Sequence, residues 1–98
     1  MAEINGLAGK LSLGYYQVAE LGSWTLTPEG NGQFTGYATI SKVIDAFYLE
    51  HSDPTRFTVD FVFGKRGLGG PCASASLDLE AKRIGFRFTD ERRTSCLS

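Results

Sequence analysis

The stretch that decides the fold is Arg56-Phe57-Thr58-Val59-Asp60-Phe61-Val62-Phe63. Every second residue in it is large and apolar, namely Phe57, Val59, Phe61 and Phe63. Successive side chains of a β-strand point to opposite faces of the sheet. The alternation therefore predicts a strand that buries one face and turns Thr58, Asp60 and Val62 to the other.

The same alternation returns twice downstream, in 73–80 and in 84–88. Three such segments in succession predict an antiparallel meander. The glycine-rich segment 64–71 is expected to be the flexible loop that joins the first two strands.

The register of the last hairpin follows from its apolar residues. A tip at Ala81 and Lys82 makes one face wholly apolar, because it pairs Leu79 with Ile84, Leu77 with Phe86 and Ala75 with Phe88. Ala-Lys is a poor sequence for a two-residue turn that needs positive φ. A longer or bulged loop of the same parity is the alternative.

Further strands are predicted before residue 41. Segments 24–27 and 34–40 flank the turn formers Pro28-Glu29-Gly30-Asn31-Gly32, which indicates a hairpin. In that hairpin we expect Gly36 to lie opposite Trp24, with the indole covering the missing side chain. Segment 10–20 is another β candidate, with a bulge or bend at Gly14.

Segment 41–50 has two interpretations. As a helix, Ser41 caps its start and apolar residues fall on one side at helical spacing. As a strand, the segment is apolar on both faces and ends in the turn 51–54. We favour the strand, because β-branched and aromatic residues dominate and the neighbouring segments are strands.

About seven short strands separated by turns predict a mainly β protein. We expect a small antiparallel meander of about six to seven strands that forms a barrel, a half-barrel or a strongly curved sheet, with a short helix at 41–50 as the alternative. A chain of 98 residues fits one β-rich domain over 1–91, followed by a flexible tail, 92–98.

Composition excludes several classes of protein. There is no apolar run of about 20 residues for a membrane helix, and the start has no basic segment followed by an apolar one. We therefore expect a cytoplasmic protein whose Cys72 and Cys96 stay reduced. With one histidine and no Cys-x-x-Cys spacing, we expect neither a metal nor a cofactor.

The formal net charge of -1 hides an asymmetry. Residues 1–55 hold two basic and six acidic residues, a charge of -4, whereas 56–98 hold eight basic and five acidic residues, a charge of +3. Two halves of opposite charge favour self-association of the chain, or attraction of an anionic partner by the local electrostatic potential. The alternative is that the two halves interleave in space and cancel.

Three features are candidates for chemistry. His51 and Cys72 are of the types needed for a base and a nucleophile, although no local motif joins them. Segment Gly64–Gly70 offers free backbone amides with Lys65 and Arg66, as an anion-binding loop requires. Asp60 is a carboxylate between apolar neighbours, which marks it as a candidate ligand contact. Each also has a structural interpretation as an ordinary loop or surface residue.

The aromatic content is the most unusual feature, with 12 of 98 residues. The phenylalanines already supply the apolar strand faces. Amphipathic rings are favoured at pocket mouths and interfaces, so Tyr16, Trp24, Tyr37 and Tyr48 are the candidates for a ligand site.

Short strings in the first two thirds of the chain follow one another as they do in a known family. Gly9-Lys10, Leu21-Gly22-Ser23, Phe34-Thr35-Gly36-Tyr37 and Phe57-Thr58-Val59-Asp60-Phe61 resemble the start of an avidin-type barrel. The resemblance implies a meander barrel. The later tryptophans of that family's ligand pocket have no counterpart here, so no ligand or site is carried over.

Three functions follow from these patterns. The first is a non-enzymatic module that binds an apolar or aromatic small molecule, with Trp24, Tyr37 and Tyr48 near the barrel mouth. The second is a structural or interaction protein that forms a homo-oligomer, most simply a dimer, or serves as a partner-binding adaptor. The third is a small hydrolase-like enzyme that uses Asp60 or His51. Neither a nucleic acid nor a membrane is an expected partner.

Overall fold

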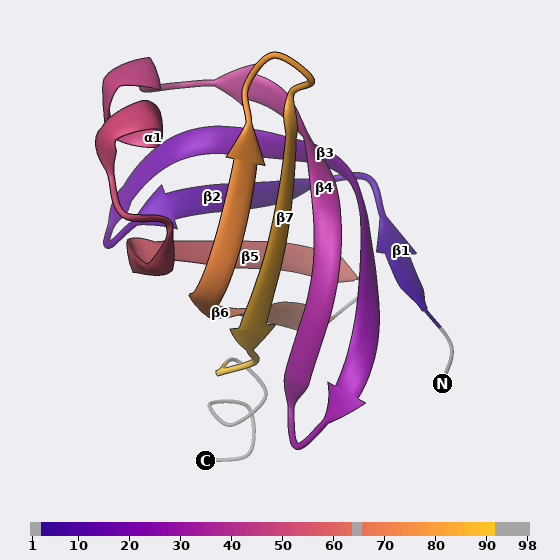
Figure 1. The fold of residues 1–98 in the computed structure, drawn as a ribbon. Helices are drawn as coiled ribbons and strands as arrows, with labels where there is room; N and C mark the ends of the chain where they lie inside the picture. The colour runs from indigo at the N-terminus through magenta and orange to yellow at the C-terminus, as the bar shows by residue number, and fades with distance from the viewer. Residues whose placement is uncertain (1–2, 64–65, 92–98) are drawn as a thin grey trace.

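The computed structural model of the chain describes residues 3–63 and 66–91 and is mainly β. Within these residues a 7-stranded antiparallel sheet curls into a barrel (Figure 1). The elements in chain order are β1 (Ile4–Gly6), β2 (Gly9–Leu13), β3 (Tyr16–Gly30), β4 (Gln33–Val43), α1 (Ala46–His51), a 3-10 turn (Pro54–Arg56), β5 (Phe57–Phe63), β6 (Arg66–Asp78) and β7 (Arg83–Thr89).

The barrel consists of two three-stranded meanders, β2-β3-β4 and β5-β6-β7. They join where β5 pairs with β2 and where β7 pairs with β4. β1 stays outside the barrel and pairs with β3, through Ile4 opposite Leu26. The short helix α1 and β1 lie on opposite sides of the barrel (Figure 1). The predicted meander barrel is thus present, with the break between its two halves at α1.

The decisive alternation is confirmed in β5 from Phe57 to Val62, whereas the side chain of Phe63 lies outside the described residues. Phe57, Val59 and Phe61 are fully buried, Asp60 is half-buried, and Val62 is exposed. Ile84, Phe86 and Phe88 of β7 are likewise buried. These inward residues fill the barrel and form its hydrophobic core.

The last hairpin has the predicted faces from Ala75 onward but not the predicted pairs. Ala73, expected on the apolar face, is exposed because the register shifts between Cys72 and Ser74. Leu77 lies opposite Ile84 and Ala75 opposite Phe86, a displacement of two residues along β6. The tip is therefore longer, and Lys82 takes a positive φ of 54° within it. Because side chains alternate with period two, a two-residue displacement leaves the apolar face intact.

Segment 64–71 was expected to be a loop, and this is wrong for most of it. β6 begins at Arg66, and its Gly70 lies opposite Val59 of β5. A side chain at Gly70 would overlap the carbonyl oxygen of Thr89. Glycine is needed here for close backbone packing rather than for a flexible connection.

The first hairpin is also tighter than predicted. β3 runs through Pro28 to Gly30, and Gly30 pairs with Gln33. Only Asn31 and Gly32 remain in the turn, with φ of 56° and 77°. Two consecutive positive φ values are typical of the type I′ turn that Asn-Gly favours.

The preferred strand interpretation of 41–50 is wrong beyond Val43. β4 ends there, and the backbone N–H groups of Ile44 and Asp45 both donate to the carbonyl of Val18. Asp45 then caps α1 by accepting from Tyr48 N. The cap expected at Ser41 is absent, because the Ser41 hydroxyl donates to the carbonyl of Glu20 instead.

Trp24 covers a glycine, but not the expected one. Its Cα partners are Ala38 on β4 and Gly6 on β1, while Gly36 lies opposite Leu26. A side chain at Gly6 would overlap the indole ring. Nε1 of the buried Trp24 donates to the carbonyl of Ala8 at 2.8 Å, which ties the start of β2 to β3.

In the described part of the chain, no helix has the length and apolar character needed to cross a membrane.

Candidate functional site

Aromatic side chains occupy the barrel interior. The Phe61 ring lies 4.7 Å from that of Trp24, 5.5 Å from that of Phe86 and 6.0 Å from that of Phe88, measured between ring centroids. All four side chains are buried. Trp24, one of the residues predicted to lie near a barrel mouth, is thus part of the core.

Tyr16 and Tyr48, two of the predicted site residues, come together beside α1. Their rings meet edge to face at 5.6 Å, and Phe47 meets Tyr48 in the same way at 5.7 Å. His51 lies against Phe47 at 4.7 Å. Tyr15 precedes Tyr16 in the β2–β3 turn and is fully exposed. We call Tyr15, Tyr16, Phe47 and Tyr48 the helix-end aromatic surface.

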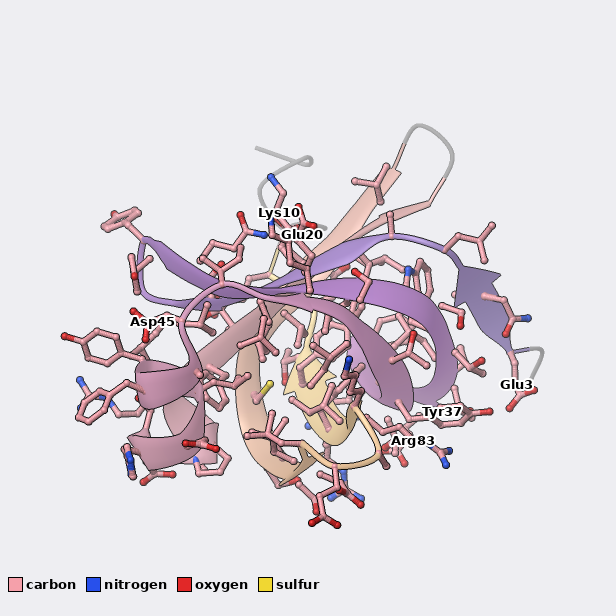
Figure 2. The ribbon with its side chains drawn as sticks, turned by 90° about the horizontal axis from the view of Figure 1, so that it is seen from above. Glu3, Lys10, Glu20, Tyr37, Asp45 and Arg83 are labelled. Carbon is pink, nitrogen blue, oxygen red and sulfur yellow. The ribbon has the colours of Figure 1, made fainter. Side chains whose placement is uncertain are left out.

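Asp45 joins the two parts of this surface, and Figure 2 shows it beside α1. One of its carboxylate oxygens accepts from Tyr48 N, and the other accepts from the Tyr16 hydroxyl at 2.6 Å. The hydrogen bond from Tyr16 lowers the pKa of Asp45, and the cap contact with Tyr48 lowers it further. The same hydrogen bond to Asp45 raises the pKa of Tyr16. A carboxylate thus fastens the β2–β3 turn to the start of the helix.

Tyr37 belongs to a different wall of the barrel. It lies on β4 opposite Gly85 of β7, and the Arg83 guanidinium lies 6.0 Å from its ring centroid. Figure 2 shows Tyr37 and Arg83 together, on the other side of the molecule from Asp45. The predicted tyrosines therefore do not form one site.

Asp60 borders a groove on the outer wall where β2, β3 and β5 run side by side. The groove has a volume of about 620 Å³. The residues that line it are Leu7, Ala8, Gly9, Lys10, Glu20, Leu21, Gly22, Ser41, Asp60 and Val62. Leu7 and Val62 are both large, apolar and exposed. We call this feature the outer groove.

A row of alternating charges crosses the strands along the outer groove. Lys10 lies opposite Glu20 on one side and opposite Asp60 on the other, and Glu20 lies opposite Lys42. Figure 2 shows Lys10 and Glu20 next to each other on the barrel wall. Directly opposed residues of unlike charge stabilise neighbouring strands.

The charges of the two chain halves also meet elsewhere on the wall. Arg87 lies 3.4 Å from Glu29. Together with the Lys10–Asp60 pairing, this favours the interpretation in which the halves interleave.

The predicted anion-binding loop lies partly outside the described residues. Lys65 lies outside the described residues, and so does the side chain of Arg66, whose backbone pairs with Phe63 in the β5–β6 hairpin.

His51 and Cys72 have different surroundings. His51 is exposed on α1 beside Phe47, whereas Cys72 is buried in β6. Burial raises the pKa of the Cys72 thiol to about 11, which keeps it protonated near neutral pH. Within residues 3–63 and 66–91, no three residues of the types His, Cys, Asp or Glu are grouped as a metal site requires.

Sequence reasoning missed Phe47 and Asp45 at the helix end and Leu7 and Val62 at the outer groove. One signal was available, because Val62 is an apolar residue on the polar face of an alternating strand. The contact between Tyr16 and Tyr48 had no such signal, because it depends on how β3 and α1 pack.

No family model, curated protein or solved structure is significantly similar to this chain.

Proposed function

We propose that this barrel is a non-catalytic interaction module that associates with a second copy of itself through the helix-end aromatic surface. The supporting observation is the exposure of its rings, which reaches 110% for Tyr15, 48% for Tyr16, 65% for Phe47 and 46% for Tyr48. Exposed aromatic residues are typical of the centres of protein interfaces.

The exposed area of the four rings is large enough to form much of an interface with a second copy of the chain. Because a large aromatic residue offers about 200 Å², the four rings expose about 500 Å² together. A standard interface takes about 800 Å² from each partner, so the rings supply more than half of one side. The exposed Val43 and Ile44, which directly precede Asp45, add to it. In a two-fold dimer the same surface serves both partners.

The Asp45 contacts support a preformed interface. Because Asp45 holds both the Tyr16 hydroxyl and the N-terminus of α1, the Tyr16 ring and the start of the helix need little ordering when a partner binds. Low ordering cost raises affinity without new contacts.

Sedimentation velocity of the full chain over a range of concentrations tests the proposal. We expect a monomer–dimer equilibrium, and Phe47→Ser should shift it to monomer because the most exposed ring of the helix is removed. The matched control is Tyr37→Ser, which removes a comparably exposed ring, 52%, from the other wall and should leave the dimer unchanged. A wild-type chain that stays monomeric at high concentration, or a Phe47→Ser dimer as stable as wild type, would overturn the proposal.

The salt dependence of the dimer distinguishes this proposal from association through charged surfaces. An apolar interface should persist or strengthen in high salt, whereas attraction between charged surfaces is screened. Dissociation of the dimer on raising the salt concentration would assign the contact to the charged walls instead.

A further inference from the structure

The wall that carries Tyr37 has a trough on its outward face, on the other side of the molecule from α1 (Figure 2). Two adjoining hollows form it, of about 430 Å³ and about 340 Å³, and they share Ser76 and Gly85. Each lies within the range of small-molecule pockets, about 300–1,000 Å³. We call the joint hollow the Gly85 trough. It runs from Tyr37 and Arg83 at one end to Arg87 at the other.

The trough exists because a glycine stands at the centre of the outward face of β4, β7 and β6. Gly85 of β7 lies opposite Tyr37 of β4 and opposite Ser76 of β6. Arg83 and Arg87 lie two residues before and after Gly85, so they share its face. A side chain at Gly85 would meet nothing closer than a backbone oxygen of β4 at 3.9 Å. The space above Gly85 is thus open, and larger side chains border it.

Polar groups that border the trough are available to a ligand. Among the described residues, the Arg83 guanidinium forms no hydrogen bond or ion pair, and it lies 6.0 Å from the Tyr37 ring centroid. The hydroxyls of Ser74, Ser76 and Tyr37 likewise form no hydrogen bond within that part of the chain. A guanidinium has five N–H donors, and each hydroxyl both donates and accepts. A ligand can therefore find both kinds of partner here.

The charges around the trough are balanced, which favours a neutral ligand. Asp78 lies opposite Arg83 in the strand register. Arg87 is ion-paired with Glu29 at 3.4 Å. An anion attracted to either arginine would be repelled by the acid beside it, and a cation would meet the reverse. One Asp78 oxygen accepts from the backbone N–H of Ala81, and the other accepts no hydrogen bond from the described residues.

Tyr37 adds an apolar platform to these polar groups. Its side chain is half exposed, and a tyrosine ring has an apolar body with a polar tip. A sugar in its pyranose form has the two matching parts. Its faces consist of C–H groups, and its rim carries hydroxyls that both donate and accept hydrogen bonds.

We propose that this trough binds a neutral pyranose sugar, with one C–H face on the Tyr37 ring and its hydroxyls on Arg83 and Asp78. The ring stack contributes through burial of apolar surface. The guanidinium and the carboxylate set the orientation of the sugar, because hydrogen bonds to ionised groups are the stronger ones. The site is independent of the helix-end aromatic surface, so the sugar binds monomer and dimer alike.

Ligands that separate the two parts of a sugar test the proposal. Methyl β-D-glucopyranoside, methyl β-D-galactopyranoside and methyl α-D-mannopyranoside are titrated separately against the 15N-labelled full chain at pH 7. We expect at least one of them to shift the amide resonances of Ser76 and Gly85 saturably, with a Kd on the order of 1 mM. Tetrahydropyran, the bare ring, and sorbitol, the hydroxyls without a ring, should bind more weakly. No shift with any of the three glycosides, or equal binding of either control ligand, would overturn the proposal.

A charged sugar tests the preference for a neutral ligand. Methyl β-D-glucuronide differs from the glucoside by a carboxylate in place of a hydroxymethyl group. We expect it to bind no more tightly than the glucoside, because Asp78 and Glu29 oppose an anion. Tighter binding of the glucuronide would contradict the balance of charges and assign the trough to acidic ligands.

Filling the trough places the ligand within it. Gly85→Val adds a side chain where the structure has open space and suits a strand, so the fold should be retained while the sugar-induced shifts disappear. Thr58→Val puts the same side chain on β5 and should leave the shifts unchanged. Thermal unfolding checks that both variants are folded. Binding that survives in folded Gly85→Val would contradict a site in this trough.

Two further variants test the named contacts. Arg83→Met keeps the length of the side chain without its donors and should weaken the glycoside roughly threefold to tenfold. Lys42→Met, which removes a positive charge from the end of β4, should not weaken it. Tyr37→Ser should weaken it through loss of the platform, whereas Phe47→Ser on the helix-end aromatic surface should leave it unchanged. Equal effects of each variant and its control would contradict the contacts.

Discussion

The molecule uses aromatic rings in two opposite ways, inside the barrel and at the helix end. Phe61 lies within 6.0 Å of three other ring centroids and is fully buried. Phe47 also contacts two rings, Tyr48 and His51, yet it stays largely exposed. Contact between rings is common to both groups, and what differs is whether an opposite strand covers them. In α1 only Leu49 is buried against the barrel.

The largest difference should appear when one ring is deleted from each group. Phe61→Ala leaves a cavity among packed rings and should destabilise the fold by about 3–5 kcal/mol. Phe47→Ala should change the stability of the monomer by about 0.5 kcal/mol or less. Urea unfolding followed by circular dichroism, at a concentration low enough to keep the chain monomeric, measures both. Equal losses would contradict the division into core and surface rings.

A smaller effect is expected from filling the space beneath one buried ring. Gly6→Ala places a methyl group against the Trp24 indole and should destabilise the fold by about 1–3 kcal/mol. In Gly85→Ala the added carbon meets nothing closer than the Gly36 carbonyl oxygen at 3.9 Å, so that strand glycine is the control. The difference between the two thermal midpoints is the measurement. If the thermal midpoint of Gly85→Ala fell as far as that of Gly6→Ala, the general effect of replacing a strand glycine would explain both losses.

The smallest effect should come from pH, and it tests the Asp45 contacts at the helix end. The pKa of Asp45 is lowered in the folded chain. Its stabilising contribution is therefore present above the carboxyl pKa of the unfolded chain, about 4, and is lost as the pH falls through the lower folded value. Between pH 6 and pH 2.5, the thermal midpoint of the wild type should decrease more than that of Asp45→Asn.

A control on the same helix separates this effect from general acid unfolding. Glu50→Gln removes a carboxylate from α1 that makes no cap contact, and its pH profile should follow that of the wild type. The pKa of Asp53 is also lowered, first by the backbone N–H of Thr55 and then by its hydroxyl, so some acid sensitivity should remain in Asp45→Asn. A profile of Asp45→Asn that matches the wild type would contradict the role given to Asp45.

The strands and their buried faces could be predicted because their signal is local. Alternation within β5 and β7 fixes which side chains turn inward, and the Asn31–Gly32 turn is encoded in two residues. The helix within 41–50 was only the alternative interpretation, for a physical reason. It has six residues and buries only Leu49, so it leaves almost no periodic pattern, and its start depends on the single cap at Asp45.

The sites were harder to predict than the strands because they join distant segments. The charge row depends on the pairing of Lys10 with Asp60, and the aromatic surface depends on Tyr16 meeting Tyr48. In each pair, the residues next to one partner in the sequence do not indicate which distant residue it will contact. Sequence reasoning singled out Tyr16, Tyr48 and Asp60 individually, but their assembly into sites required the register of the closed barrel.

The pairing of β2 with β5 also governs the order in which the chain can fold. β2 is made early, but its outer edge finds no partner until residues 57–61 have left the ribosome. The first meander must therefore wait with an open strand edge, and such edges invite pairing with other chains. Closure over so long a separation also makes folding slow. The barrel is safest when synthesis through β5 is fast, and a pause in translation between α1 and β5 should favour aggregation.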